Sequence, residues 1–307
     1  MKHLFIINPV AGGKKNRLEE TLAAIKEFSI TLNDPYETYI TKTPMDASGK
    51  IVEEAEKAEE SGDSLRVYAC GGDGTLNECA NGAANRMNVA ITHYPCGTGN
   101  DFLKTFGKEN VSKFRDLHAL STGAVKQLDL IDCNGRYGIN ICSVGIDARI
   151  GTDVHKYSNI PVIGGATGYV VSMIINVIKG VTQKFKITVD GKVIEKKITL
   201  ACICNGRYYG GGFNPVPDAV PDDGILDSLI VEPVSRFQVA KIVGRYAKGM
   251  FRDFPKIFTY IRGQGMEIEC DREFVVNIDG EALYTDKICF KLVPKGINFV
   301  FPSELIE

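Results

Sequence analysis

Apolar runs that end in glycine-rich segments are the feature that most restricts the fold of this chain. The runs HLFIIN (3–8), LRVYAC (65–70) and NVAITHY (88–94) have the continuous hydrophobicity of strands covered on both faces. YETYIT (36–41) predicts a further strand, and Asp46 is expected to cap a helix that ends at Ser61-Gly62. Apolar residues at helical spacing follow two of these strands. After HLFIIN they are Leu18, Leu22, Ile25 and Phe28, and after LRVYAC they are Leu76, Cys79, Ala80 and Ala83. Repeated strand–helix units predict a mainly parallel sheet with helices on both sides, a Rossmann-like α/β domain.

The pattern changes near residue 125. Three pairs of apolar strands surround Asn134-Gly135, Asp190-Gly191 and Asp279-Gly280, dipeptides that are typical of tight hairpin turns. Helices are expected near 165–179 and 235–250. We therefore predict an α/β domain over 1–125, joined by the returning segment 293–307, and an antiparallel β-sandwich domain over 126–292.

Composition excludes several classes of function. The net charge of −2 provides no basic field for nucleic acid. The nine cysteines form no CxxC pair and the four histidines lack metal-ligand spacing, so zinc and a histidine-based triad are not expected. We expect free thiols in a reducing cytosol and no signal peptide at Met1-Lys2-His3. Residues 157–178 carry no charge, but Pro161 and paired glycines favour a buried or interfacial helix over a membrane span.

Three glycine-rich loops follow predicted strands: NPVAGG (8–13), GGDGTLN (71–77) and PCGTGND (95–101). Ligands of open α/β sheets bind where strands end, and glycine lets backbone approach them closely. A helix that begins near Thr75 would point its amides at the same place, which favours phosphate. Asp73 would repel phosphate unless it acts through Mg²⁺ or accepts a hydrogen bond from a hydroxyl. The alternative for this loop is a tight strand-to-helix turn in which Asp73 bonds its own backbone.

The loops lack the P-loop and dinucleotide fingerprints. GGDGTLNECANG (71–82) resembles the signature of the diacylglycerol kinase catalytic family, which includes sphingosine, ceramide and bacterial diacylglycerol kinases. The segments NPVAGG, TKTPMDA (41–47), PCGTGNDF (95–102), SVGIDA (143–148), NGRYYGGGF (205–213), PDAVPDDGILD (217–227) and NIDGE (277–281) follow in the family's order. The shorter GGDG core also occurs in NAD kinases and phosphofructokinases. The resemblance covers nearly the whole chain and implies a nucleotide-binding α/β domain followed by a β-sandwich domain.

The resemblance also implies roles for individual residues. It places ATP against Asn8, Pro9, Val10, Ala11, Gly12, Thr41, Gly71, Gly72, Asp73, Gly74, Thr75, Leu76, Asn77 and Thr98. It assigns the network around catalytic Mg²⁺ to Asp73, Asp101 and Asp129. A second, structural Mg²⁺ would be bound by Asp223 with the backbone carbonyls of Val220 and Ile225.

The resemblance also implies a general base at Asp279, with Glu281 as the second choice and Asp73 as a rival, because sphingosine kinases assign an equivalent role to its loop. The dipeptide Asp279-Gly280 is also typical of a simple hairpin turn. The residue could be both a turn residue and a general base if the turn presents its carboxylate to a cleft. The resemblance therefore implies an ATP- and Mg²⁺-dependent kinase that phosphorylates a lipid hydroxyl, diacylglycerol first, to give phosphatidic acid. Such a protein would be cytoplasmic and meet its lipid at the membrane surface; relatives suggest a homodimer. A NAD kinase-like enzyme with a soluble substrate and a non-catalytic nucleotide or lipid sensor are the alternatives.

Overall fold

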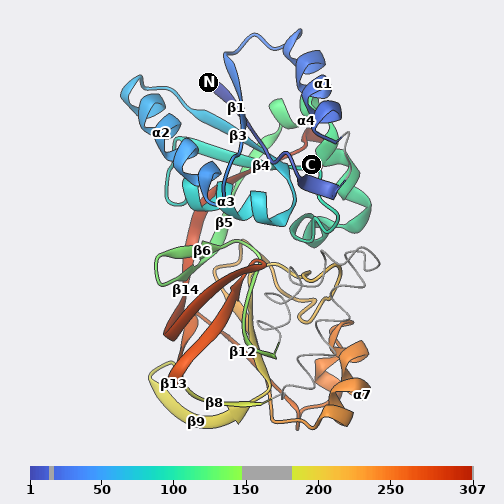
Figure 1. Cartoon of the computed structure of the whole chain (residues 1–307), viewed down its shortest axis with the longest axis vertical. Coiled ribbons are helices and arrows are strands. Elements are labelled where there is room, and N and C mark those ends of the chain that lie inside the picture. Colours follow the sequence, from blue (N-terminus) through green and yellow to red (C-terminus); the bar gives the residue numbers. More distant parts are fainter. Residues whose placement is uncertain (14–16, 147–181, 306–307) are drawn as a thin grey trace. The chain divides into compact units, whose positions relative to one another are not determined.

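A computed structural model of the chain describes residues 1–13, 17–146 and 182–305 (Figure 1). The chain forms two compact units, one made of Met1–Leu130 with Pro294–Glu307 and the other of Ile131–Val293. The helix expected near 165–179 and the uncharged stretch 157–178 lie outside the described residues. None of the helices in the described ranges has the length and hydrophobicity needed to cross a bilayer.

The N-terminal unit is built on a parallel sheet. Its strands are β1 (Lys2–Ile7), β2 (Tyr36–Ile40), β3 (Leu65–Gly71) and β4 (Val89–Pro95), and they lie side by side in the order β4-β3-β1-β2. The last part of β14 (Glu281–Phe301) extends this sheet, because Asn298 and Phe299 pair in parallel with Ala90 and Ile91 of β4. The predicted α/β architecture is thereby confirmed.

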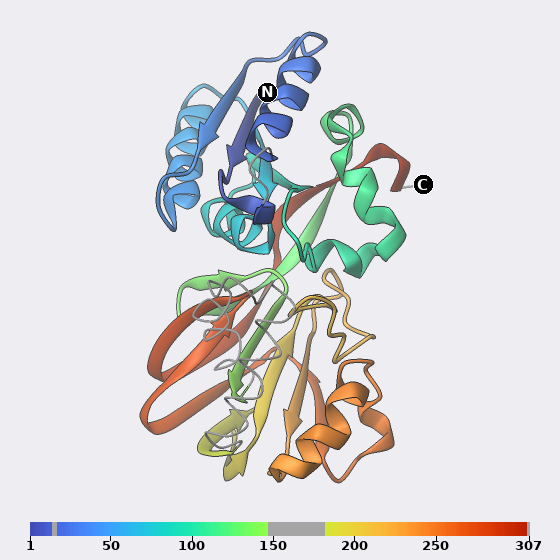
Figure 2. The same cartoon turned by 45° about the vertical axis from the view of Figure 1, so that its right-hand side comes forward.

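Helices cover both faces of this sheet (Figures 1 and 2). The helix α1 (Arg17–Ser29) lies on one face with the short α4 (Leu117–Ser121), where the rings of Phe28 and His118 meet edge to face. On the other face α2 (Asp46–Glu60) packs against α3 (Asp73–Ala83). Short 3-10 turns complete the unit: η1 (Ala11–Gly13), η2 (Phe102–Phe106), η3 (Lys108–Arg115) and η5 (Ser303–Leu305).

The start of α2 differs from the prediction. Asp46 is the first helical residue rather than the cap, and Met45 stands before it with a φ of 66°. The Asp46 carboxylate accepts hydrogen bonds from the Tyr39 hydroxyl and the Lys42 amide, both at 2.8 Å. The side chain therefore ties the helix to β2 and its following loop instead of capping its own helix.

The C-terminal unit is antiparallel, as predicted. Strands β12 (Phe258–Gly263), β11 (Leu226–Val231), β10 (Leu200–Cys204), β7 (Ile141–Gly145), β13 (Gly265–Ile278) and β14 are neighbours in that order. The hairpin of β8 (Gln183–Val189) and β9 (Lys192–Ile198) pairs with β13, and β6 (Arg136–Gly138) pairs with β5 (Ala124–Cys133). A helix, α7 (Arg236–Tyr246), and the turn η4 (Phe251–Asp253) follow β11.

The predicted hairpin turns have the backbone conformation that their sequences favour. Asn134, Asp190 and Asp279 have φ values of 55°, 49° and 51°, and each is followed by a glycine that also has a positive φ. Two successive positive-φ residues define the turn that matches the natural twist of paired strands.

The returning strand carries an aromatic cluster into the N-terminal unit. Phe299 is fully buried, and its ring lies 5.6 Å from that of Phe102 and 5.1 Å from that of Phe301 between ring centroids. Phe106 and Phe114 pack against the same rings. The segment that follows the glycine loop of β4 is thus anchored by residues from the other end of the chain.

We predict that Phe299→Ala lowers the free energy of unfolding by about 3–5 kcal/mol, because it opens a cavity inside this cluster. Urea unfolding measures the change. Val193→Ala, at a side chain that is 56% exposed, is the control and should cost less than about 0.5 kcal/mol. Equal effects of the two substitutions would show that the returning strand does not support the unit.

Candidate functional site

The three glycine-rich loops meet at the carboxyl edge of the parallel sheet. They leave β1, β3 and β4, which follow one another in the sheet. The Asn8 amide donates to the Cys70 carbonyl at 3.1 Å, and the Asn8 side chain donates to the Thr75 hydroxyl at 3.2 Å. A methyl group added at Gly12 would lie 2.5 Å from the carbonyl oxygen of Cys96. Each loop therefore contacts the other two.

The carbonyl of Gly71 holds two of these loops together. It accepts hydrogen bonds from the amides of Cys96 and Gly97, at 2.8 and 3.0 Å, and from Nε2 of His93 at 3.1 Å. His93 is fully buried, and burial lowers the pKa of its imidazole to about 4, so the ring is neutral and donates at neutral pH. Sequence reasoning missed His93; its position in a strand that reads as buried on both faces was the available signal.

The glycines serve contacts between loops more than we expected. We interpreted the bare backbone as space for an anion, but a methyl group at Gly97 would lie 2.5 Å from Cα of Gly72. One at Gly71 would lie 2.1 Å from the Thr75 hydroxyl. Real Cβ atoms do not approach other atoms so closely, so Gly97 is required for the second and third loops to pack together, and Gly71 is required by the turn of its own loop at Thr75. Gly13, with a φ of 63°, has nothing within 4 Å of its Cβ position and faces open space.

The helix α3 begins inside the second loop. Gly72 is its N-cap residue and has no side chain to cap it, and Leu76 donates the first helical hydrogen bond, to the Gly72 carbonyl at 3.1 Å. Amides of a first helical turn have no carbonyl partner inside their own helix and carry the positive end of its dipole. An anion held beside Gly72 would meet this helix end.

Two carboxylates converge on the third loop. The Cβ position of Gly99 is 3.0 Å from Oδ2 of Asp73 and 3.7 Å from Oδ2 of Asp101. Oδ1 of Asp73 accepts the amide of Phe102 at 3.2 Å, and Oδ1 of Asp101 pairs with Lys104 at 2.5 Å. Two predicted members of the magnesium network are thus neighbours.

Asp129, the third predicted member of the magnesium network, contacts the returning segment. It is buried, and its Oδ1 accepts the amide of Lys295 at 2.7 Å, which fixes the start of the returning segment. Nowhere in the described ranges do three or more His, Cys, Asp or Glu form a group that could hold a metal ion. Asp73 and Asp101 nevertheless fit Mg²⁺, which proteins commonly bind through one or two carboxylates together with phosphate oxygens and water.

The remaining residues expected at ATP fall into two groups. Pro9, Val10 and Thr98 are exposed, and the Thr41 amide donates to the carbonyl of Ile7 at 3.0 Å, beside the first loop. Ala11, Thr75, Leu76 and Asn77 are buried, and the side chain of Leu76 belongs to the core. Only the backbone of Leu76 can meet a ligand.

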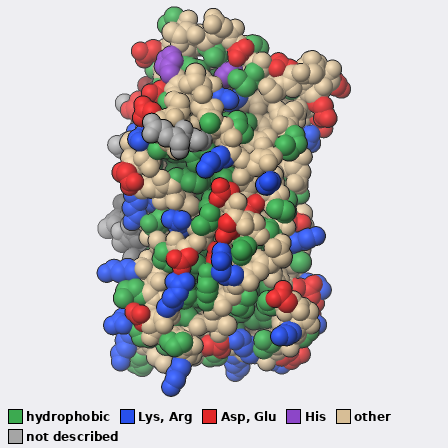
Figure 3. Space-filling model, turned by 180° about the vertical axis from the view of Figure 1, so that it is seen from behind, with side chains coloured by type: hydrophobic (Ala, Val, Ile, Leu, Met, Phe, Trp, Pro, Cys, Tyr) green, Lys and Arg blue, Asp and Glu red, His purple; other side chains and the backbone are tan. Residues whose placement is uncertain are grey.

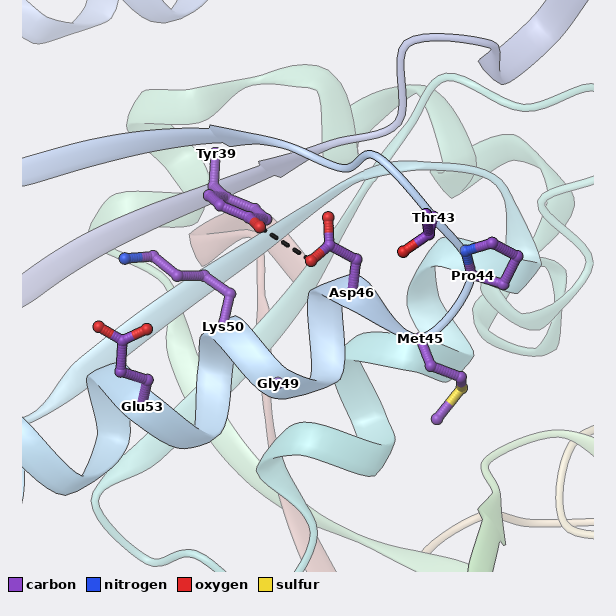
Figure 4. Close-up of a pocket in the computed structure, with 8 residues that line it drawn as sticks. All are labelled: Tyr39, Thr43, Pro44, Met45, Asp46, Gly49, Lys50 and Glu53. Atoms are coloured by element: carbon purple, nitrogen blue, oxygen red, sulfur yellow. Dashed lines mark hydrogen bonds between the residues drawn. The ribbon is translucent and has the colours of Figure 1, made fainter.

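A surface pocket of 490 Å³ lies at the start of α2 (Figure 4). It is lined by Tyr39, Thr43, Pro44, Met45, Asp46, Gly49, Lys50 and Glu53. Its charged groups already have protein partners, since Asp46 accepts from Tyr39 and Lys50 pairs with Glu37 at 2.7 Å and Glu54 at 2.8 Å. Thr41 does not line this pocket, and we assign no ligand to it.

In the C-terminal unit, Asp279 is held by backbone amides. Its Oδ1 accepts from Asn140 at 3.0 Å and Ile141 at 2.9 Å, and its Oδ2 accepts from Ile139 at 2.7 Å. These three amide donors fix the orientation of the carboxylate. Asp279 is therefore both the turn residue and a positioned carboxylate. Glu281, the first residue of β14, is exposed.

The carboxylate expected at the structural magnesium contacts an arginine. Oδ2 of Asp223 pairs with Nη2 of Arg262 at 2.8 Å, and Oδ1 accepts the Ile225 amide at 3.0 Å. Arg262 also bonds Asp227, whose carboxyl pKa is raised by burial although the Tyr260 hydroxyl and Arg262 oppose the shift. A cation bound by Asp223 would compete with Arg262 for this carboxylate. The structural magnesium site that we expect at Asp223 and the carbonyls of Val220 and Ile225 stays a prediction.

We predict that Gly97→Ala destabilises the N-terminal unit by about 1–3 kcal/mol, because the new methyl group meets the backbone of Gly72. Gly49→Ala is the control: its Cβ position is open and it lies within α2, so alanine should stabilise the fold by about 0.5–1 kcal/mol. Urea unfolding compares the two. A neutral Gly97→Ala would show that the second and third loops are not in contact.

The comparisons with known proteins agree with this architecture. Residues 2–133 match the diacylglycerol kinase catalytic domain, and residues 140–301 match the YegS C-terminal NAD kinase beta sandwich-like domain. A Staphylococcus haemolyticus protein named "Putative lipid kinase SH2167" is 30% identical over 83% of this chain and 82% of its own length. The Shewanella frigidimarina "Probable lipid kinase YegS-like" is 28% identical over 77% of this chain and 76% of its own.

Solved structures of diacylglycerol kinases match nearly the whole chain. The crystal structure of a diacylglycerol kinase from Bacillus anthracis covers 99% of this chain and 98% of its own, with a TM-score of 0.69 and 25% identity. A second structure from the same organism, titled a putative diacylglycerol kinase, has a TM-score of 0.75 and 26% identity over the same shares. The chain therefore belongs to the diacylglycerol kinase catalytic domain family, among the YegS-like lipid kinases.

Proposed function

We propose that this protein transfers the γ-phosphoryl group of ATP to the hydroxyl of a lipid, with diacylglycerol as the first candidate and phosphatidic acid as the product. One observation carries the proposal: three loops of nearly bare backbone meet at a helix N-terminus, and the carboxylates of Asp73 and Asp101 converge beside them. Phosphoryl transfer is catalysed mainly by positioning and charge neutralisation, and this arrangement provides groups for both.

The loops divide the work of binding ATP. The phosphates lie against the backbone of the first and second loops, where Gly13 leaves open space and the α3 terminus favours negative charge. The exposed Thr98 and the neighbouring Thr41 contribute hydroxyl groups. His93 donates to the Gly71 carbonyl and so fixes the backbone where the second and third loops meet.

Magnesium would be held by Asp73 and Asp101, directly or through water. When bound, it neutralises charge on the transferring phosphoryl group. Lys104 pairs with Oδ1 of Asp101, so the metal would share this carboxylate with the ammonium group or displace it, and the Phe102 amide orients Asp73. Asp129 supports the site indirectly, because it fixes the returning segment through Lys295.

Asp279 is our candidate for the group that accepts the proton of the lipid hydroxyl. Three backbone amides orient its carboxylate and occupy part of its accepting capacity. A strong base is not required, because the transition state of phosphoryl transfer is loose and proton removal comes late. Glu281 and Asp73 are the second and third candidates for this role.

The rival functions are separated by one assay. The protein is incubated with Mg²⁺ and ATP labelled at the γ-phosphate, in detergent micelles that contain diacylglycerol, monoacylglycerol or a sphingoid base, and in parallel with NAD. Label that enters the organic phase supports a lipid kinase, and the lipid that gives it identifies the substrate. Label found only in NADP would replace this proposal with a NAD kinase, and ATP binding without any turnover would favour a sensor.

We predict that Asp279→Asn lowers kcat by about 10²–10⁴-fold, the usual contribution of general acid–base catalysis, and leaves the Kd for ATP within a factor of about two. Asp190→Asn is the matched control, since Asp190 occupies the same turn position in the β8–β9 hairpin with a φ of 49°. It should leave kcat unchanged. Equal activity of the two variants would remove Asp279 from the reaction.

A further inference from the structure

One face of α7 is exposed and unused by the fold. Phe237, Lys241, Gly244 and Lys248 are spaced by four, three and four residues, so they share one side of the helix and its final turn. All four are exposed, and Phe237 is 84% exposed, the largest fraction among the exposed large hydrophobic side chains of the described residues. We call Phe237, Lys241 and Lys248 the outer face of α7.

The opposite face holds the helix firmly. Ile242 and Tyr246 are buried in a hydrophobic cluster, and the Tyr246 hydroxyl bonds that of Tyr209 at 2.8 Å. Ser235 and Gln238 form reciprocal hydrogen bonds that cap the helix start. The exposed phenyl group thus stands on a rigid first turn rather than on a frayed end.

The surroundings of this face are strongly basic. The stretch PVSRFQVAKIVGRYAKGMFR (233–252) contains Arg236, Lys241, Arg245, Lys248 and Arg252 and no acidic residue, although the chain as a whole has a net charge of −2. Arg252 pairs with Asp218 at 2.6 Å, and Arg245 lies over the ring of Phe254. Within the part of the chain that the structure describes, Lys241 and Lys248 form no ion pair.

The wider surface agrees with this distribution. Figure 3 shows Lys and Arg side chains along the lower left edge of the molecule, on the side where α7 lies when Figure 1 is seen from behind. Met250, 41% exposed, adds apolar surface shortly after the helix ends. An exposed aromatic ring among lysines is the combination that binds a membrane interface, where the ring enters the headgroup region and the lysines meet anionic lipids.

We propose that the outer face of α7 docks the protein on an anionic lipid bilayer. This inference rests on the proposed function, since a lipid kinase must collect its substrate from a membrane. A bilayer fits better than a protein groove, because a single aromatic side chain flanked by lysines has no further apolar anchor on the same face. The attraction should weaken as ionic strength rises, because Lys241 and Lys248 act through charge.

Vesicle sedimentation tests the proposal with the full chain and no ATP. The wild-type protein should bind vesicles of equimolar phosphatidylcholine and phosphatidylglycerol and leave vesicles of phosphatidylcholine alone. Phe237→Ser should weaken binding about tenfold, the loss expected for one phenyl group left in water. Lys241→Ala and Lys248→Ala should each weaken it about fivefold.

The control is Ile30→Ser, an equally exposed apolar side chain at 81% in the N-terminal unit, which should bind as the wild type does. All four variants replace exposed side chains, so urea unfolding should show unchanged stability. Wild-type binding that is equal on neutral and anionic vesicles, or α7 variants that bind like the wild type, would overturn the proposal.

Turnover in detergent micelles separates this inference from the proposed function. The α7 variants should phosphorylate micellar lipid at the wild-type rate and lose rate only on vesicles. If neither the wild type nor the variants phosphorylate any lipid while vesicle binding follows the pattern above, the docking surface stands and the kinase proposal fails. Equal losses of rate in micelles and on vesicles would contradict docking by α7.

Discussion

The close approach of the Gly72 and Gly97 backbones is the contact on which the candidate site depends. A methyl group at Gly97 would lie 2.5 Å from Cα of Gly72 and would push the second and third loops apart, which would break the pair of hydrogen bonds from Cys96 and Gly97 to the Gly71 carbonyl. Buried backbone groups without a partner cost free energy. The hydrogen bonds from the Cys96 and Gly97 amides to the Gly71 carbonyl therefore hold the two loops together at the start of α3.

Support for these loops comes from distant parts of the chain. His93 reaches the Gly71 carbonyl from inside β4, and its neutral form is maintained because burial lowers the pKa of the ring. Above about pH 6.5 the ring is neutral in both the folded and the unfolded chain and stability does not depend on its titration. As the pH falls toward 4 the fold loses stability, because the unfolded chain binds a proton that the buried ring does not bind. Phe299 packs behind the segment that carries Asp101, so a strand near the end of the chain stabilises a loop near its beginning.

Much of the fold could be predicted from local pattern, and the site only in part. Continuous apolar runs predict β1, β3 and β4, and Asn134-Gly135, Asp190-Gly191 and Asp279-Gly280 adopt the positive φ values that their hairpins require. Spacing cannot reveal contacts made across the chain: the donors from residues 139–141 to Asp279, the capture of Asp223 by Arg262 and the anchoring of Asp129 by Lys295 each join residues far apart in sequence. Local propensity also missed that Asp46 bonds Tyr39 rather than capping α2, since the competing partner lies on a neighbouring strand.

Hydrogen exchange with a non-hydrolysable ATP analogue and Mg²⁺ shows whether the three loops bind nucleotide. Backbone amides in residues 8–13, 71–77 and 95–101 should exchange more slowly when the nucleotide and the metal are both present, with a smaller change at 8–13 when Asp73 is replaced by asparagine. The pocket residues 43–53 at the start of α2 should exchange at an unchanged rate. Protection confined to that pocket or to the C-terminal unit, with the three loops unaffected, would contradict the account.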